Sequence, residues 1–98
     1  MIARMWHGRV RQGLLDEYRA YIARTGAAEL KATPGNLATY VFTRERDDHG
    51  EVIVLSLWDR EESIRAFAGE ELLRARYYPE DPQYLLELPE YLDHYDAL

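Results

Sequence analysis

Two histidines and a pair of adjacent tyrosines are the side chains of this chain best suited to acid–base chemistry. His7 lies next to the end of the segment IARMWHG (2–8), and His94 lies near the C-terminal end. Imidazole titrates near neutral pH, so we predict His7 as a catalytic base and His94 as a substrate contact. Tyr77 is predicted as a second catalytic residue and Tyr78 as a substrate-binding residue, because a phenol in an aromatic pocket can orient a substrate oxygen.

A structural role is the alternative for each candidate residue. His7 could bond to backbone at the end of its strand. Trp58 and Phe67 stand at positions that usually belong to a hydrophobic core, and we predict both as walls of the substrate site. Pro79 and Pro82 stiffen the turn that follows the two tyrosines, which suits either a fixed wall or a hinged flap. We expect the segment 75–87 to close one side of a cleft.

Motifs for metals and cofactors are absent from the sequence. There is no cysteine, which excludes disulfides, thiolate metal sites and cysteine nucleophiles. The histidines show neither HExxH nor HxH spacing, so we expect no metal site. The glycines are scattered rather than gathered in a phosphate loop, no GxSxG elbow occurs, and the chain has no room for a dinucleotide-binding unit. We therefore expect no cofactor.

Length and charge narrow the class of protein. The 98 residues predict a single domain over 1–98. The net charge is −6 and no basic stripe occurs, which makes nucleic acid a poor partner. No apolar run approaches the roughly 20 residues of a membrane span, and the opening MIARMWHGRV lacks the apolar segment of a signal peptide. We expect a cytoplasmic protein without membrane contact.

Hydrophobic periodicity and turn residues divide the chain into alternating elements. We expect strands at 2–8, 36–46, 51–59 and 90–98. We expect a helix at 12–31, a second helix capped by Asp59 and Glu62, a short helix at 71–78 and one more turn at 81–87. The order βαββαβ predicts a ferredoxin-like α+β fold with a four-stranded antiparallel sheet and both main helices on one face.

The strands at 36–46 and 51–59 are apolar on both alternating faces. Helices can cover only one face of such a sheet, so the second face needs another partner. A second copy of the chain, related by a two-fold axis, is the simplest one, and we expect a homodimer.

The direction of Arg4 and His7 depends on the parity of the first strand. If odd positions face the helices, His7 lines the cleft with Ala3 and Met5. Arg4 then faces the dimer interface, with Asp93 as a plausible partner for its charge. If the parity is reversed, Arg4 becomes an anion clamp in the pocket and His7 lies outside it. We expect the first arrangement.

Three segments of the chain resemble the antibiotic biosynthesis monooxygenase-like family. They are the opening IARMWHG, the stretch SLWDREESIRAFAGEELLRARYYPED and a C-terminal HY. The resemblance covers nearly the whole chain, and ATPGN and RARYYPED look like marks of one subgroup. It implies a dimeric α/β barrel, in which two four-stranded sheets face each other and the helices lie outside.

Family activities are more varied than the family fold. Some members resemble cofactor-independent oxygenases of polycyclic phenols or anthrones, and others degrade haem or oxidise or isomerise quinols. Haem-degrading members place a tryptophan where Phe67 stands, a histidine where Tyr77 stands and an asparagine near His7, so haem degradation is disfavoured here. We predict a cofactor-independent monooxygenase acting on a small aromatic or polycyclic phenol or quinol. The alternatives are a non-catalytic dimer that binds a small hydrophobic ligand, and an isomerase or decarboxylase on the same scaffold.

Overall fold

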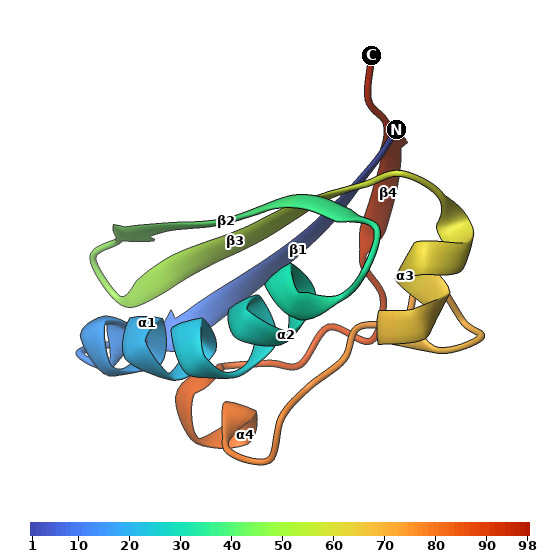
Figure 1. Cartoon of the computed structure of the whole chain (residues 1–98). Coiled ribbons are helices and arrows are strands. Elements are labelled where there is room, and N and C mark those ends of the chain that lie inside the picture. The colour runs from blue at the N-terminus through green and yellow to red at the C-terminus, as the bar shows by residue number, and fades with distance from the viewer.

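A four-stranded antiparallel sheet in the order β2-β3-β1-β4 organises the chain (Figure 1). The computed structural model describes residues 1–98. Its elements are β1 (Ile2–Arg11), α1 (Leu15–Arg24), α2 (Gly26–Ala32), β2 (Asn36–Glu45), β3 (His49–Trp58), α3 (Glu61–Ala68), α4 (Asp81–Tyr84) and β4 (Asp93–Asp96). The predicted ferredoxin-like α+β fold is confirmed. None of these helices is long and apolar enough to cross a membrane.

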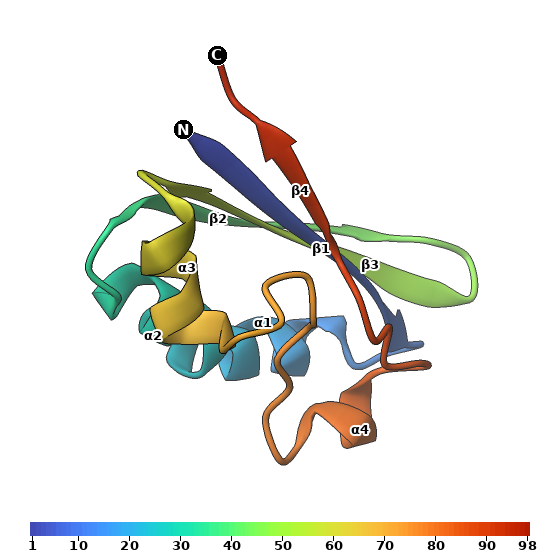
Figure 2. The ribbon, with the colours of Figure 1, turned by 90° about the vertical axis from the view of Figure 1, so that its right-hand side faces the viewer.

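All four helices lie on one side of the sheet (Figure 2). The helix α1 packs Leu15, Tyr18 and Ile22 toward the sheet, at the three- and four-residue spacing of an amphipathic helix. The even positions of β3 face these helices, and Val52 and Val54 belong to the same buried cluster. The hydrophobic core therefore fills the layer between the helices and one face of the sheet.

The parity of β1 is the reverse of the predicted one. Arg4, Gly8 and Val10 are buried on the helix side, whereas His7 and Arg9 are exposed. The strand is also longer than predicted, because it runs to Arg11 in full register with β3. The even residues are thus the ones that can line a cleft between the helices and the sheet.

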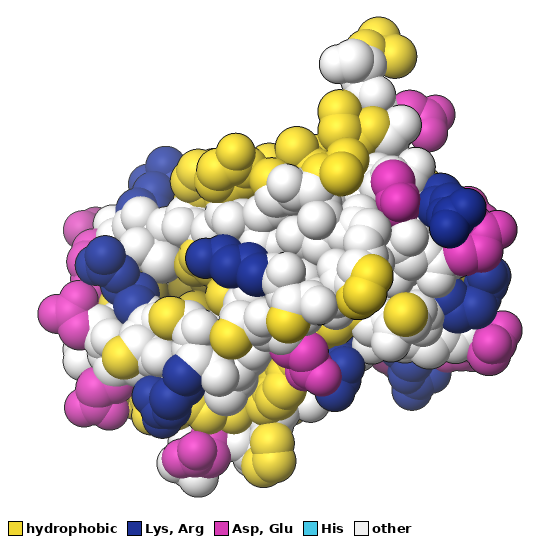
Figure 3. All heavy atoms as spheres, in the orientation of Figure 1, with side chains coloured by type: hydrophobic (Ala, Val, Ile, Leu, Met, Phe, Trp, Pro, Cys, Tyr) yellow, Lys and Arg dark blue, Asp and Glu magenta, His cyan; other side chains and the backbone are white.

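The other side of the sheet is apolar and uncovered, and we call it the open face. It is made by Met5, Tyr40, Phe42, Ile53, Leu55, Leu57 and Tyr95. The rings of Tyr40 and Phe42 stack with centroids 6.1 Å apart and are about half exposed. Figure 3 shows hydrophobic side chains gathered above β2, on the side away from the helices.

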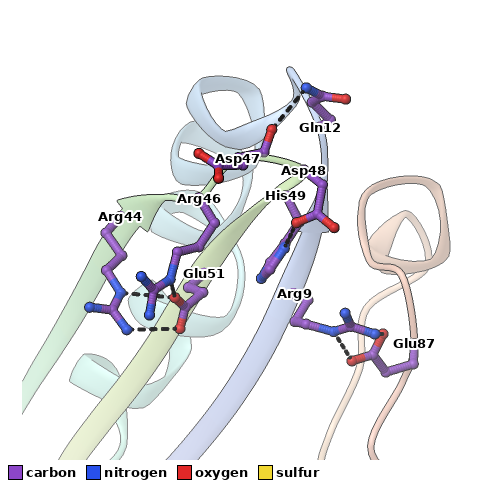
Figure 4. Close-up of polar contacts among 9 residues, drawn as sticks. All are labelled: Arg9, Gln12, Arg44, Arg46, Asp47, Asp48, His49, Glu51 and Glu87. Atoms are coloured by element: carbon purple, nitrogen blue, oxygen red, sulfur yellow. Dashed lines mark hydrogen bonds and ion pairs between the residues drawn. The ribbon is translucent and has the colours of Figure 1, made fainter.

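Charged side chains border the open face at the β2–β3 hairpin (Figure 4). Glu51 accepts hydrogen bonds from Arg44 and Arg46, and these lower the pKa of its carboxyl group to about 2. Arg9 on the next strand pairs with Glu87, with Nε 2.7 Å from the carboxylate. The apolar part of the open face therefore ends at a cluster of paired charges.

Several element boundaries differ from the prediction. The helix at 12–31 is broken at Thr25 into α1 and α2, and the Thr25 hydroxyl donates to the Tyr21 carbonyl 2.8 Å away. The expected helix at 71–78 is wrong. Residues 71–74 form a turn closed by the bond from Arg74 N to Glu71 O, residues 75–78 have no regular structure, and Arg74 forms a β-bridge with Tyr91. The Asp59–Glu62 capping box is also absent, because the Asp59 carboxylate accepts from Ser63 instead.

The last strand is shorter than expected because the chain leaves the sheet before it. Leu85 and Leu86 pair with the end of β1, and β4 pairs with its beginning. Between them, the backbone of residues 87–92 bonds to 73–75 instead of to the sheet. The Leu92 amide donates to the Leu73 carbonyl and the Ala75 amide donates to the Glu90 carbonyl, both at 2.8 Å. Two distant segments are thereby joined beside the helix-facing side of β1.

Two glycines with positive φ provide a matched stability test. Gly35 and Gly69 have φ of 92° and 88°, but only at Gly35 would an added Cβ collide with Ser63. We expect Gly69→Ala to lower the free energy of unfolding by about 1–3 kcal/mol from backbone strain alone, because φ of 88° with ψ of −169° is a conformation that essentially only glycine adopts. Gly35→Ala should cost more than Gly69→Ala, because the clash with Ser63 adds about 1–3 kcal/mol to the backbone strain. Urea denaturation measures both, and equal costs would contradict the packing at Gly35.

Candidate functional site

A cavity of about 60 Å³ lies between the helices and the sheet. Its walls include five aromatic side chains, Trp6, Tyr18, Phe67, Tyr77 and Tyr78. The strands β1 and β3 supply its floor through Arg4, Trp6, Val54 and Ser56, and the segment after α3 closes it. Aromatic walls with a few polar groups are typical of small-molecule sites.

Trp6 and Tyr77 form one wall as a hydrogen-bonded pair. The Trp6 indole donates to the Tyr77 hydroxyl at 3.0 Å, and that hydroxyl donates to the Pro89 carbonyl at 2.5 Å. The rings meet edge to face, with centroids 6.1 Å apart. Burial raises the pKa of Tyr77, so the phenol keeps its proton at neutral pH. Gly8 leaves room for this wall, because a Cβ there would collide with the Trp6 ring.

Tyr78 and Arg76 form the opposite wall. The Tyr78 hydroxyl donates to the Glu29 carboxylate, and Arg76 pairs with the same carboxylate at 3.0 Å. The Arg76 guanidinium lies between the rings of Phe67 and Tyr78, at 5.0 and 5.3 Å from their centroids. Burial, followed by the bond to Glu29, raises the pKa of Tyr78. These contacts tie α2 to the segment that follows α3.

Arg4 projects from β1 into the same cavity and is only 4% exposed. Its guanidinium donates to the carbonyls of Leu72 and Arg74, the latter at 3.1 Å, and lies 3.0 Å from His94 Nε2. Desolvation lowers the pKa of Arg4 to about 10. The group still carries its charge at neutral pH, and no carboxylate is paired with it.

Asp81 is the one carboxylate that lines the cavity. It is 4% exposed, accepts from the Tyr18 hydroxyl at 3.0 Å and accepts from the Tyr78 amide at 2.6 Å. Burial and the neighbouring Asp81 charge raise the pKa of Tyr18. Each Asp81 oxygen has further lone pairs, so the group can accept one more proton donor from a ligand.

The predicted site residues fall into two groups. Tyr77, Tyr78 and Phe67 line the cavity, and both tyrosine hydroxyls are bonded inside the protein rather than to bulk solvent. Trp58 does not line it. This residue is fully buried in the core, where its indole donates to Ser56 Oγ at 2.9 Å. The prediction of Trp58 as a substrate wall is therefore corrected, because its side chain packs in the core and Ser56, to which it bonds, lines the cavity in its place.

The two predicted histidines lie in different places: His7 on the open face and His94 beside Arg4. His7 is exposed on the open face, so the expectation that it lines the cleft is wrong. His94 pairs in register with Arg4, which agrees with the expected neighbourhood, but it does not line the cavity. Desolvation and the Arg4 charge lower the pKa of His94. The chemical roles of these residues stay predictions.

Sequence reasoning missed Trp6, Ser56 and Asp81. Trp6 follows from the reversed parity, because it shares its face with Arg4. Ser56 carried a signal, since it is the single polar residue in the run from Val52 to Trp58. Asp81 lay inside the segment expected to close the cleft, but its burial depends on Tyr18, 63 positions away in the chain.

The family model described as antibiotic biosynthesis monooxygenase matches residues 1–76. No curated protein matches the chain. The match ends just before Tyr77, so the segment from 77 to 98, which carries one wall of the cavity and β4, lies outside the matched span.

The lowered pKa of His94 predicts a pH dependence of stability. The unfolded chain takes up this proton near pH 6.5, whereas the folded protein takes it up only at lower pH. Stability should therefore fall as pH drops below about 6.5, until the folded histidine is protonated. His94→Gln should remove this part of the profile, and the matched change His7→Gln should keep it. An NMR titration that places the pKa of His94 at or above its ordinary value would contradict the burial beside Arg4.

Proposed function

The chain belongs to the antibiotic biosynthesis monooxygenase family, and from that premise we propose that its cavity binds a small aromatic hydroxy compound and oxidises it with dioxygen. The observation that supports this is the aromatic cavity between the helices and the sheet, with Asp81 as its one carboxylate. The absence of metal and flavin motifs from the sequence favours a reaction without a cofactor.

The size of the cavity restricts the substrate. A cavity of about 150 Å³ holds one benzene molecule, and this cavity measures about 60 Å³. A substrate therefore enters only when the wall formed by Arg76 and Tyr78 moves outward. We propose a single-ring phenol or quinol rather than a polycyclic one, because one ring requires the smaller movement.

The proposed reaction begins with loss of the phenol proton to Asp81. The electron-rich anion passes one electron to dioxygen, and the two radicals join through a new carbon–oxygen bond. Asp81 then returns its proton to the peroxide. The O–O bond breaks, and the hydroxide released takes the hydrogen of the ring carbon as a proton and leaves as water. The phenol and dioxygen become a quinone and water, and each product receives one of the two atoms of the dioxygen. Tyr77 keeps its proton in this scheme, donates it in a hydrogen bond to the Pro89 carbonyl, and orients the substrate by accepting a hydrogen bond from a substrate hydroxyl.

A non-catalytic ligand-binding protein is the second candidate. No histidine lines the cavity, and Asp81 already accepts two hydrogen bonds. A base with these commitments accepts a third proton donor less readily than a free carboxylate. Binding without turnover is what such an arrangement favours if Asp81 serves only to fix Tyr18 and the backbone of Tyr78.

We also propose that two copies of the chain associate through their open faces. Tyr40, Phe42 and Tyr95 are each at least half exposed there, and large apolar patches of this kind mark interaction sites. A two-fold axis would bring the two patches together and set the charged hairpin ends at the rim.

Light scattering tests the dimer. We expect a mass of about twice 11.5 kDa for the wild type. Phe42→Arg should give a folded monomer, because a charge would be buried in the apolar interface. Leu73→Arg changes a residue of similar exposure outside the open face and should leave the dimer intact. A wild-type mass of one chain at micromolar concentration would rule out the association.

Oxygen uptake by metal-stripped protein tests the reaction. Hydroquinone and other electron-rich single-ring phenols should be consumed faster than anthrones, because they fit the cavity. Asp81→Asn should reduce the rate by about 10²- to 10⁴-fold, the usual effect of losing a general base. His7→Ala should keep it, since His7 lies on the open face. Uptake that collapses in His7→Ala instead would return the role of base to His7, and binding without uptake would favour the second candidate.

A further inference from the structure

The charge of Arg4 is buried without a compensating anion. Proteins that bury a guanidinium normally pair it with a carboxylate, because an unpaired buried charge is costly. Arg4 has only two carbonyl oxygens, one neutral histidine nitrogen and the Phe67 ring, 6.0 Å from Cζ. These contacts hold the guanidinium in place and leave its positive charge facing a cavity.

The guanidinium also has donors to spare. Arginine carries five N–H groups. Nη1 uses both of its hydrogens on Leu72 and His94, and Nη2 uses one on Arg74. The Nε hydrogen and one Nη2 hydrogen remain without a protein acceptor. Parallel N–H groups on neighbouring guanidinium nitrogens are the arrangement that holds both oxygens of a carboxylate.

Ser56 offers a further donor beside Arg4. It is the direct cross-strand neighbour of Arg4, is 1% exposed and lines the same cavity. Its oxygen accepts the Trp58 indole N–H at 2.9 Å, and its own hydrogen has no acceptor in the protein. Because the Ser56 oxygen accepts from Trp58, its hydrogen stays free to donate to a ligand in the cavity. The buried indole of Trp58 thus supports a site that it does not itself touch.

We infer that Arg4 and Ser56 form a carboxylate-binding site on the floor of the cavity, and that the natural ligand is an aromatic carboxylic acid. The inference rests on the proposed function and names its substrate class: a ring that carries a hydroxyl group toward Asp81 and a carboxylate toward Arg4. The two buried charges of opposite sign line one cavity without pairing with each other. A ligand with an anionic end and a donor end satisfies both.

A purely structural role for Arg4 makes a different prediction. The guanidinium joins the carbonyls of Leu72 and Arg74 to β1, so it helps to hold the wall in place. If that were its whole role, the charge of a ligand would have no influence on binding. Comparing ligands of equal shape and different charge therefore separates the two roles without any mutation.

The experiment is calorimetric titration of the full chain with benzoate, benzamide and acetate at pH 7. Benzoate and benzamide share a ring and a planar head group, and acetate is an anion without a ring. We expect benzoate to bind about 10- to 100-fold more tightly than benzamide, the range for charge-assisted bonds. Arg4→Met and Ser56→Ala should each reduce this preference, and Arg11→Met, on the exposed end of the same strand, should retain it.

The outcomes separate this inference from the proposed function. Equal affinity for benzoate and benzamide would overturn the carboxylate site and keep the aromatic site. Binding of acetate but of neither aromatic compound would keep the anion site and overturn the proposed function. Binding of none of the three would overturn both. If Arg4→Met does not fold, Ser56→Ala and the wild-type preference still decide, because neither alters the bonds to Leu72 and Arg74.

Discussion

A buried guanidinium on the first strand is the group around which the rest of the cavity is assembled. Arg4 reaches from the sheet to the carbonyls of Leu72 and Arg74, in a stretch that has no regular structure of its own. That stretch pairs in turn with residues 90–92, so backbone hydrogen bonds join the two irregular segments. In a domain this small, such bonds replace part of the core that it has no room to build. The charge is costly to bury, but its bonds add to the backbone bonds of 73–75 with 90–92 in fixing the position of this wall.

The fold was predictable from the sequence because its strands and helices follow strong periodic patterns. The two-sided apolar strands at 36–46 and 51–59 and the amphipathic spacing after 12 required a sheet with helices on one face. The prediction of which residues of β1 face the helices failed, because the segment 2–8, taken alone, is apolar on both faces. The deciding signal lay just beyond it: in Gly8-Arg9-Val10-Arg11 the charged residues alternate with apolar ones. Extending the strand over these residues places the even positions inward, since a shift of one residue exchanges the two faces.

The cavity itself was only partly predictable, because its walls come from residues that are distant in sequence. Tyr77 and Tyr78 could be expected to point in different directions, yet each finds a separate partner, the Pro89 carbonyl and the Glu29 carboxylate. Neither pairing follows from local spacing. The composition of the acidic tail indicated that it would pair with the rest of the chain, because residues 77–98 contain no Lys or Arg. Its carboxylates meet arginines of the earlier chain, as in Arg9–Glu87, although exposed pairs of this kind add little stability.

The two sides of the cavity differ in how firmly they are held, and this difference decides how a ligand enters. The floor belongs to β1 and β3, whose residues pair continuously along ten positions. The outer wall depends on Arg76 and Tyr78, whose contacts with Glu29 and Phe67 lie near the surface. Opening that wall breaks a few partly exposed contacts, whereas moving the floor would break the sheet. The floor therefore keeps Arg4, Trp6 and Ser56 in fixed positions while the wall moves. A second copy packed on the open face would stiffen the floor further, because it would cover the same strands from the opposite side.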